Sequence, residues 1–235
     1  MIKSRVLLAG ALVATAGAAN AAVTVTPTVV SDYDFRGIAQ TAKDPAFQLS
    51  VNYAHDSGFY VGLWGSNVDF GPGDPNIEID AFAGFAGGDA TETFGYDVGV
   101  NYYSYVSMSD LNFFEVYGGL SKGPFAAKLW FSPEFGGKYT DESAYYLEGN
   151  LNYPIGESGF SALAHVGYSG GDYWDAYYGD GYFDWAVGVS KSFGNFTVSL
   201  KYIDGGDLAD GPTDIFSTDS KVWASISTTL PWAAD

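Results

Sequence analysis

The sequence contains no cysteine among its 235 residues, so no disulfide can stabilise the fold and no lipid can be attached through an N-terminal cysteine. Basic residues are also scarce. Ten lysines and arginines stand against 28 aspartates and glutamates, which gives a formal net charge of −18. Nucleic acid is therefore not an expected partner, because a protein that neutralises phosphates presents a basic surface.

Long hydrophobic runs are missing too once the first 21 residues are set aside. A transmembrane helix needs about 20 consecutive apolar residues, so none is expected in residues 22–235. Mean hydropathy is +0.00, yet aromatic residues make up 17% of the chain and there are 31 glycines. This composition favours a β protein in which apolar residues alternate with polar ones.

The first 21 residues have the pattern of a secretory signal peptide. Lys3 and Arg5 precede an apolar run over residues 6–16, and small residues follow at 19–21. The run is too short to span a membrane as an anchor. We expect cleavage after Ala21, which leaves residues 22–235 as a single domain with a formal charge of 8 − 28 = −20.

Apolar and polar residues alternate along most of the mature chain, which is the signature of β-strands that have one apolar face. In residues 77–85, for example, Ile77 and Ile79 share a face opposite Glu78 and Asp80. Twelve such segments are predicted, an even number: 23–36, 47–55, 59–68, 77–85, 93–105, 112–121, 124–132, 144–153, 160–169, 182–193, 196–203 and 220–230.

The connections between these segments alternate in length. Those after even-numbered segments are short, as at 122–123 and 194–195, whereas later odd-numbered ones reach 169–181 and 204–219. Outer-membrane barrels have short periplasmic turns and long extracellular loops, and a soluble sandwich has no reason to sort its loops in this way. The pattern therefore predicts an all-β, antiparallel, up-and-down transmembrane barrel with its short turns in the periplasm.

Aromatic residues lie mainly at the ends of the predicted strands, as expected for the two girdles of a membrane barrel. A soluble β core would instead place them in mid-strand. The closed form is also required physically, since an open sheet edge in hydrocarbon would leave backbone groups unpaired. The girdle residues are Phe59, Phe94, Phe125, Phe160 and Phe196 at the short-turn end, and Tyr33, Phe35, Phe47, Tyr102, Phe131, Tyr145, Phe183 and Tyr202 at the other.

Six stretches of the sequence match the pattern of a known family: 31–33, 35–38, 40–41, 45–46, 58–70 and 78–80. Through these stretches the chain resembles the TorF-type family of proteobacterial outer-membrane porins. The resemblance implies an outer-membrane β-barrel with a role in solute passage, whose partners are outer-membrane lipid and the barrel assembly machinery. Such barrels usually end on an aromatic residue that this machinery recognises, whereas here Trp232 is followed by Ala-Ala-Asp.

Arg36 stands out as a single arginine among acids and aromatics. Alternation through the first segment directs Tyr33 and Phe35 outward, and therefore Asp32, Asp34 and Arg36 into the lumen near the mouth. As a latch, Arg36 would pair with Asp32, Asp34 or a strand acid and hold the first loop across the mouth. As a selectivity element, it would place a fixed charge on the solute path. We favour the latch, because a ring of charged side chains selects ions through the number of its charges, and Arg36 is a single residue.

The same alternation predicts a mildly acidic lumen. If the lumen conducts, we expect small solutes or ions to pass with a preference for cations, through a narrow pore, since twelve strands fall between filled eight-stranded barrels and wide porins. These charges could instead pair across the lumen and plug it. The predicted inward residues are Glu78, Asp80, Asp97, Glu115, Glu148 and Asp184, with Lys128, Lys201, Lys221 and His165.

The long loops are rich in aspartate, and Asp204, Asp207 and Asp210 form a weak candidate for a divalent-cation site. Their spacing fits no EF-hand, and Gly-Asp pairs are common in turns, so the turn interpretation is preferred. We predict no cofactor.

Two other functions compete with a channel. One is a closed barrel that presents its loops for surface interaction. The other is a lipid-modifying enzyme, which would need a Ser–His pair on the outer face. Of the two histidines, His55 lies at a short turn and His165 points inward, so the sequence predicts no enzyme.

Overall fold

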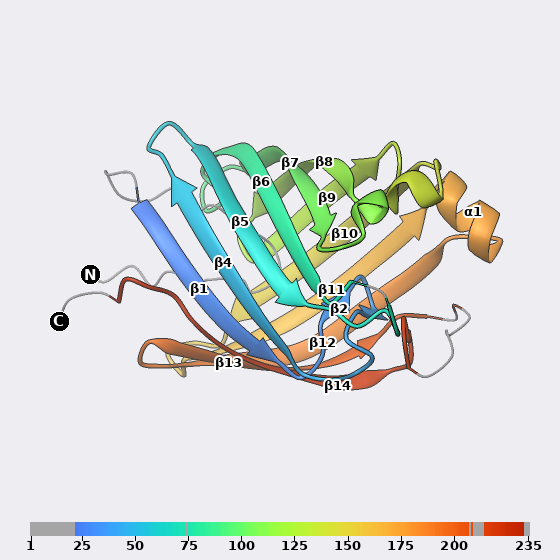
Figure 1. Ribbon diagram of the computed structural model, residues 1–235. Coiled ribbons are helices and arrows are strands. Elements are labelled where there is room, and N and C mark those ends of the chain that lie inside the picture. Colours follow the sequence, from blue (N-terminus) through green and yellow to red (C-terminus); the bar gives the residue numbers. More distant parts are fainter. Residues whose placement is uncertain (1–21, 74, 207, 209–213, 233–235) are drawn as a thin grey trace.

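The structure is a computed structural model that describes residues 22–73, 75–206, 208 and 214–232, so the predicted signal peptide (1–21) lies outside the described residues. Twelve antiparallel strands form a closed barrel in which β1 pairs with both β4 and β14 (Figure 1). The prediction of a twelve-stranded, all-β, up-and-down barrel is confirmed.

The barrel strands are β1 (Ala22–Val30), β4 (Ala46–Ala54), β5 (Phe59–Asn67), β6 (Ile77–Gly88), β7 (Gly95–Tyr105), β8 (Phe113–Lys122), β9 (Phe125–Ser132), β10 (Ala144–Pro154), β11 (Phe160–Gly170), β12 (Tyr182–Phe193), β13 (Phe196–Asp204) and β14 (Lys221–Thr228). Tight turns gather at one end of the barrel and the longer connections at the other, which is the right-hand end in Figure 1. We call these the short-turn end and the long-loop end.

The outer face of the barrel is apolar. Leu63, Val98 and Leu129 are each about half exposed, although they lie in mid-strand. Most of the predicted girdle aromatics are exposed in the same way near the strand ends, among them Phe59, Phe94, Phe125, Phe47, Phe131 and Phe183. Among the described residues, no helix has the length and apolar character needed to cross a membrane.

The first predicted strand, 23–36, is wrong in its second half. β1 ends at Val30, and the chain then leaves the barrel wall and makes a small hairpin from β2 (Asp34–Phe35) and β3 (Ile38–Ala39). Arg36 and Gly37 at its turn have positive φ values of 55° and 80°, so the strand pattern cannot continue there. Tyr33 and Phe35, predicted to face outward, pack inside the barrel instead.

The long-loop end also contains a helix that the sequence pattern did not indicate. Residues 169–181 were predicted as a loop, but helix α1 (Asp172–Tyr178) forms there and ends at Gly179, which has the left-handed conformation typical of a helix C-terminus. Trp174 anchors the helix, since its buried ring contacts Tyr182 and Phe135. Two short 3₁₀ turns, η1 (Ser109–Leu111) and η2 (Gly137–Tyr139), complete this end.

Large rings lie flat on the inner wall because glycines stand beside them. Tyr117 pairs in register with Gly99, and Tyr60 pairs with Gly84. A Cβ atom added to Gly99 would lie 2.5 Å from the Tyr117 hydroxyl and 2.6 Å from the carbonyl oxygen of Ala83. These glycines therefore make room for the inner layer of tyrosines.

We expect Gly99→Ala to destabilise the barrel by about 1–3 kcal/mol, because the new methyl group meets both a ring and a backbone carbonyl. Gly118→Ala is the matched control, since a Cβ there would find its nearest atom, in Val98, at 3.9 Å. Thermal unfolding of the refolded protein in detergent, followed by circular dichroism, measures both. Equal melting temperatures for the two variants would contradict the packing argument.

Candidate functional site in the barrel lumen

Residues 31–45, which we call the inner segment, fold into the lumen at the long-loop end. Hydrogen bonds within the segment make it compact: the Thr41 hydroxyl accepts from the backbone N–H of Tyr33 at 3.0 Å and donates to the Asp32 carboxylate at 2.9 Å. Thr41 and Ala39 are completely buried. A segment held in this way narrows the lumen at its mouth.

Arg36 fixes the inner segment to the opposite wall. Its two terminal nitrogens donate to the two carboxylate oxygens of Glu115 on β8, at 3.0 and 2.6 Å, and the Tyr103 hydroxyl donates to the same carboxylate at 2.8 Å. Glu115 is fully buried, and the Arg36 side chain is only 8% exposed. Bidentate, charge-assisted pairs of this kind are among the strongest polar contacts in proteins. The partner of Arg36 is thus a strand acid rather than Asp32 or Asp34.

Aromatic side chains enclose the guanidinium group of Arg36. Its central carbon lies 4.3 Å from the ring centre of Tyr146 and 4.6 Å from that of Phe35. The Tyr182 hydroxyl donates to the Arg36 backbone carbonyl at 2.8 Å. Rings of this kind stabilise the cation through their π faces.

Asp32 and Asp34 bind a different cation, Lys221 at the start of β14. The ammonium group of Lys221 contacts both carboxylates, at 2.8 Å for Asp34, and the Trp223 indole N–H donates to the Asp32 carbonyl at 2.8 Å. The inner segment is therefore tied to β14 on one side and, through Arg36, to β8 on the other.

Glu78 and Asp80 form an acidic pair on the inner face of β6. Glu78 accepts a hydrogen bond from the Tyr33 hydroxyl at 2.9 Å, and Asp80 accepts one from the Asn101 amide at 3.1 Å. Both acids are buried, and one carboxylate oxygen of each has no hydrogen-bond partner among the described residues. Two buried carboxylates without a cation are costly, because burial removes the water that would solvate their charge.

Deeper in the lumen, Asp97 and Lys128 form an ion pair at 2.8 Å. Lys128 also lies 4.3 Å from the ring centre of Tyr117, and the Tyr60 hydroxyl donates to Asp97 at 2.5 Å. Glu148 has no lysine or arginine partner among the described residues. It accepts hydrogen bonds from the Trp130 indole and the Asn150 amide, each at 2.8 Å.

His165 joins a neighbouring network on β10, β11 and β12. One ring nitrogen lies 2.7 Å from the Asn150 side-chain oxygen, and the other lies 2.9 Å from both Asp184 and the Tyr146 hydroxyl. Asp184 is buried. The network faces the lumen, so these groups do not form the lipid-facing site that an outer-face hydrolase would need.

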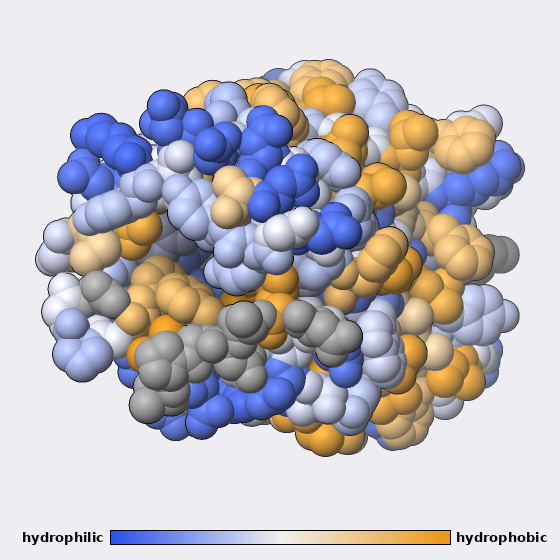
Figure 2. Space-filling view, turned by 90° about the vertical axis from the view of Figure 1, so that its right-hand side faces the viewer, coloured by the Kyte–Doolittle hydropathy of each residue, from blue (hydrophilic) through white to orange (hydrophobic). Residues whose placement is uncertain are grey.

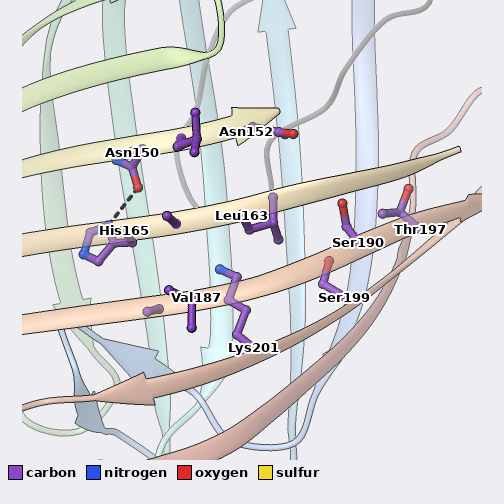
Figure 3. A pocket seen from close by; sticks show the side chains of 12 residues that line it. Asn150, Asn152, Leu163, His165, Val187, Ser190, Thr197, Ser199 and Lys201 are labelled. Carbon is purple, nitrogen blue, oxygen red and sulfur yellow. Dashed lines mark hydrogen bonds between the residues drawn. The ribbon is translucent and has the colours of Figure 1, made fainter. Parts of the chain in front are cut away.

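Lys201 differs from the other inward cations. It forms no ion pair with any residue that the structure describes, and its ammonium group lies 4.9 Å from the ring centre of Trp223. It lines a hollow in the wall together with residues of β10, β11 and β12, including Asn152 and His165 (Figure 3).

The rim of the long-loop end carries exposed ion pairs. Lys43 of the inner segment contacts Asp214 at 2.8 Å and Asp219 at 2.9 Å, and its hydrogen bond to Asp219, together with its charge, holds the pKa of Asp219 below its usual range. Figure 2 views this end and shows hydrophilic side chains over much of one side of it. Exposed ion pairs contribute little to the free energy of folding, so these pairs orient the loop segments of the rim without stabilising them appreciably.

The weak metal candidate gains no support from the described part of the chain. Asp207 and Asp210 lie outside the described residues, while Asp204 accepts a hydrogen bond from the Gly206 N–H at 3.1 Å, which is turn chemistry. Among the described residues, no group of three or more histidine, aspartate or glutamate side chains is placed to hold a metal ion.

Sequence reasoning did not identify the aromatic residues that complete these networks. Tyr103, Tyr146, Trp130 and Tyr182 supply hydrogen bonds or ring faces to the inward charges. A signal was present, because Tyr103 and Tyr146 have the same strand parity as the inward residues Asn101 and Glu148. A tyrosine at an inward position can satisfy a buried charge as well as fill space.

Comparison with known proteins supports the fold. A family model described as "Bacterial protein of unknown function (Gcw_chp)" matches residues 14–230. No curated protein sequence matches the chain significantly. The KdgM porin structure is similar, with a TM-score of 0.56 and 10% identity over 90% of this chain and 99% of that chain. The NanC porin structure gives 0.57 and 13% over 88% and 98%. At such identities the likeness establishes a porin fold, and the TorF-type resemblance stays a prediction.

Replacing Glu78 and Glu115 separately by glutamine should change stability in opposite directions. Glu78→Gln removes one of two adjoining buried carboxyl groups that have no lysine or arginine beside them among the described residues, and it keeps an acceptor for Tyr33, so we expect a gain of about 1 kcal/mol or more. Glu115→Gln leaves the buried Arg36 charge without its carboxylate, so we expect a loss of about 3–5 kcal/mol.

Urea unfolding in detergent at pH 8 measures both variants under conditions in which free carboxyl groups are ionised. A loss of stability in Glu78→Gln as large as that in Glu115→Gln would show that Glu78 is compensated after all.

Proposed function

Because the chain belongs to the Gcw_chp family of bacterial proteins of unknown function and folds as a closed twelve-stranded barrel, we propose that it is an outer-membrane channel for passive passage of small solutes or ions. The observation that carries this proposal is the sorting of side chains across the wall. Apolar residues such as Leu63 and Val98 are exposed outside, while charged and amide side chains face inward. This is the arrangement of a barrel with lipid outside and water inside.

The proposed setting follows from the same features. The protein is exported through its signal peptide into the outer membrane of a Gram-negative bacterium, inserted by the barrel assembly machinery, and surrounded by lipid. It is a channel of the TorF type and not an enzyme. The porin fold and the lumen-facing position of the His165 network support this view.

We further propose a narrow, cation-preferring path. The inner segment occupies the mouth, and the inward acids outnumber the inward lysines and Arg36. The pore-lining and selectivity candidates are Asp32, Asp34, Arg36, Glu78, Asp80, Asp97, Glu115, Lys128, Glu148, His165, Asp184 and Lys201. Of these, Glu78, Asp80 and Glu148, which have no lysine or arginine partner among the described residues, would contribute most to the preference.

A closed barrel is the second candidate, and the burial at the mouth favours it. Glu115 and Thr41 are 0% and 1% exposed, so the inner segment packs as tightly there as a protein core. Such a barrel would act through its surface loops and would not conduct.

Single-channel recording of the refolded protein in a planar bilayer, under a KCl gradient, separates the two candidates. Discrete current steps and a reversal potential of the sign expected for cation preference would support the channel. Silence from protein shown to be folded and inserted would favour the closed barrel.

The double variant Arg36→Gln/Glu115→Gln tests whether the inner segment acts as a latch. Replacing the ion pair by two neutral amides avoids an unpaired buried charge, while the bidentate contact is weakened. We expect the ratio of open to closed time to rise about fivefold, which corresponds to about 1 kcal/mol.

The matched control is Lys138→Gln/Asp110→Asn, which removes an exposed ion pair of the same end. Equal opening in the two double variants would contradict the latch and leave the channel itself intact.

A further inference from the structure

Glu78 and Asp80, the acidic pair on the inner face of β6, lie within hydrogen-bonding reach of one another. They are only 1% and 6% exposed. Tyr33 and Asn101 each donate to one oxygen of the pair, at 2.9 and 3.1 Å. The other oxygen of each acid, Glu78 Oε2 and Asp80 Oδ1, has no hydrogen-bond partner among the described residues. Buried acceptors are normally satisfied, so two such oxygens on neighbouring acids indicate a donor between them.

The groups that face the pair come from the inner segment and from β5, β7 and β8. None of these neighbours is a lysine, an arginine or a histidine, and neither acid forms an ion pair within the described part of the chain. The neighbours are Tyr33 from the inner segment, Trp64 and Ser66 from β5, Asn101, Tyr103 and Tyr105 from β7, and Glu115 from β8.

Several donors near the pair are engaged elsewhere. The Ser66 hydroxyl donates to a backbone carbonyl at 2.9 Å, and the Tyr103 hydroxyl donates to Glu115 at 2.8 Å. Both terminal nitrogens of Arg36 also donate to Glu115, so that carboxylate is neutralised and the pair is not. The acidic pair therefore differs from Glu115 in lacking any cation.

A single proton satisfies both unpartnered oxygens. Bound to either acid, it converts that oxygen into a hydroxyl donor, and the oxygen of the other acid accepts. Two adjoining carboxylates in a site that excludes water cannot readily both be ionised, because each charge loses its solvation and repels the other. A proton also needs no cavity, so the tight packing around Glu78 and Asp80 does not exclude it.

We propose that Glu78 and Asp80 share one proton at neutral pH, and that release of this proton loosens the inner segment, so that the channel opens as the pH rises. The inference rests on the proposed function, because it names the condition that regulates the channel. The proton leaves to solvent. The pair then carries two charges, and water must enter beside β6 to solvate them.

The pair supports only one side of the inner segment. Glu78 accepts from Tyr33, whose ring centre lies 5.1 Å from that of Trp64 on β5. The other sides are held by the ion pairs of Arg36 and Lys221, and both cations keep their charges between about pH 6 and pH 9. Loss of the shared proton therefore weakens the contact with β5 and β6 and leaves the ties to β8 and β14 in place.

Infrared spectroscopy of the folded protein in detergent tests the shared proton without requiring conduction. At pH 7 exposed carboxyl groups are ionised, so the carbonyl stretch of a protonated carboxylic acid reports a buried acid that keeps its proton. We expect this band in the wild-type protein and its loss in Glu78→Gln and in Asp80→Asn, because the new amide donates to the remaining carboxylate in place of the proton. The second variant serves if the first does not fold.

Glu148→Gln is the matched control. Glu148 also lies inside the barrel without a lysine or arginine partner among the described residues, but each of its oxygens accepts a hydrogen bond, one from Trp130 and one from Asn150. An ionised carboxylate is satisfied there, so the band should keep its intensity in this variant.

The pH dependence of unfolding gives a second readout. The folded protein binds one more proton than the unfolded chain, whose free carboxyl groups are ionised at neutral pH. Stability therefore falls as the pH rises, by up to about tenfold in the unfolding equilibrium constant per pH unit. Urea unfolding between pH 6 and pH 9 should show this additional slope in the wild-type protein relative to Glu78→Gln.

Single-channel recording at pH 6 and pH 9 tests the regulation. The ratio of open to closed time should rise about tenfold in the wild-type channel, the change that one proton supplies over one pH unit, and it should stay within about twofold in Glu78→Gln.

Absence of the protonated-acid band from the wild-type protein, or its survival in both variants, would overturn the shared proton. An equal ratio of open to closed time at the two pH values in a conducting channel would overturn the regulation. A barrel that shows the band and the slope but is silent at both pH values would keep the shared proton and refute the channel.

Discussion

The buried ion pair between Arg36 and Glu115 is the contact on which the arrangement of the lumen depends. It joins a segment that left the wall after β1 to a strand on the opposite wall, and it does so in a place from which water is largely excluded. A buried charge needs a partner of opposite sign, and it also needs hydrogen-bonding groups placed in the right geometry around both charges. Tyr103, Tyr146 and Phe35 provide that match, so the aromatic layer and the ion pair depend on each other.

The lumen is divided along its axis as a result. Its long-loop half is filled by the inner segment, its acids, and the rings that cover them. The hollow at β10 to β13 is lined instead by hydroxyl, amide and aliphatic side chains together with His165 and Lys201. A closed barrel permits this division because its strands pair all round, so the inner side chains can vary without exposing backbone groups. A tightly packed mouth and an unfilled hollow in the wall can therefore occur in one barrel.

The fold was largely predictable, because a barrel in lipid must repeat the same two-residue alternation in every strand. Residues 77–85 and 182–193 show this pattern, and both are strands at nearly those bounds. The pattern failed at residues 31–36, where alternation continues by coincidence: Tyr33 and Phe35 alternate with Asp32 and Asp34, yet the chain has already turned into the lumen. Short-range periodicity cannot distinguish a strand in the wall from a hairpin behind it.

By itself, the sequence determined the strand number, the two ends of the barrel and the inward side of Glu78, Glu115 and Lys128, because these follow from parity along single strands. Only the tertiary structure decided the pairing of Arg36 with Glu115, the lack of an ion-pair partner for Lys201 among the described residues, and the hollow that Asn152 and Lys201 line. Those facts depend on strand register and on where residues 31–45 lie. Contacts between residues 79 positions apart are set by the closure of the whole barrel and not by any local pattern.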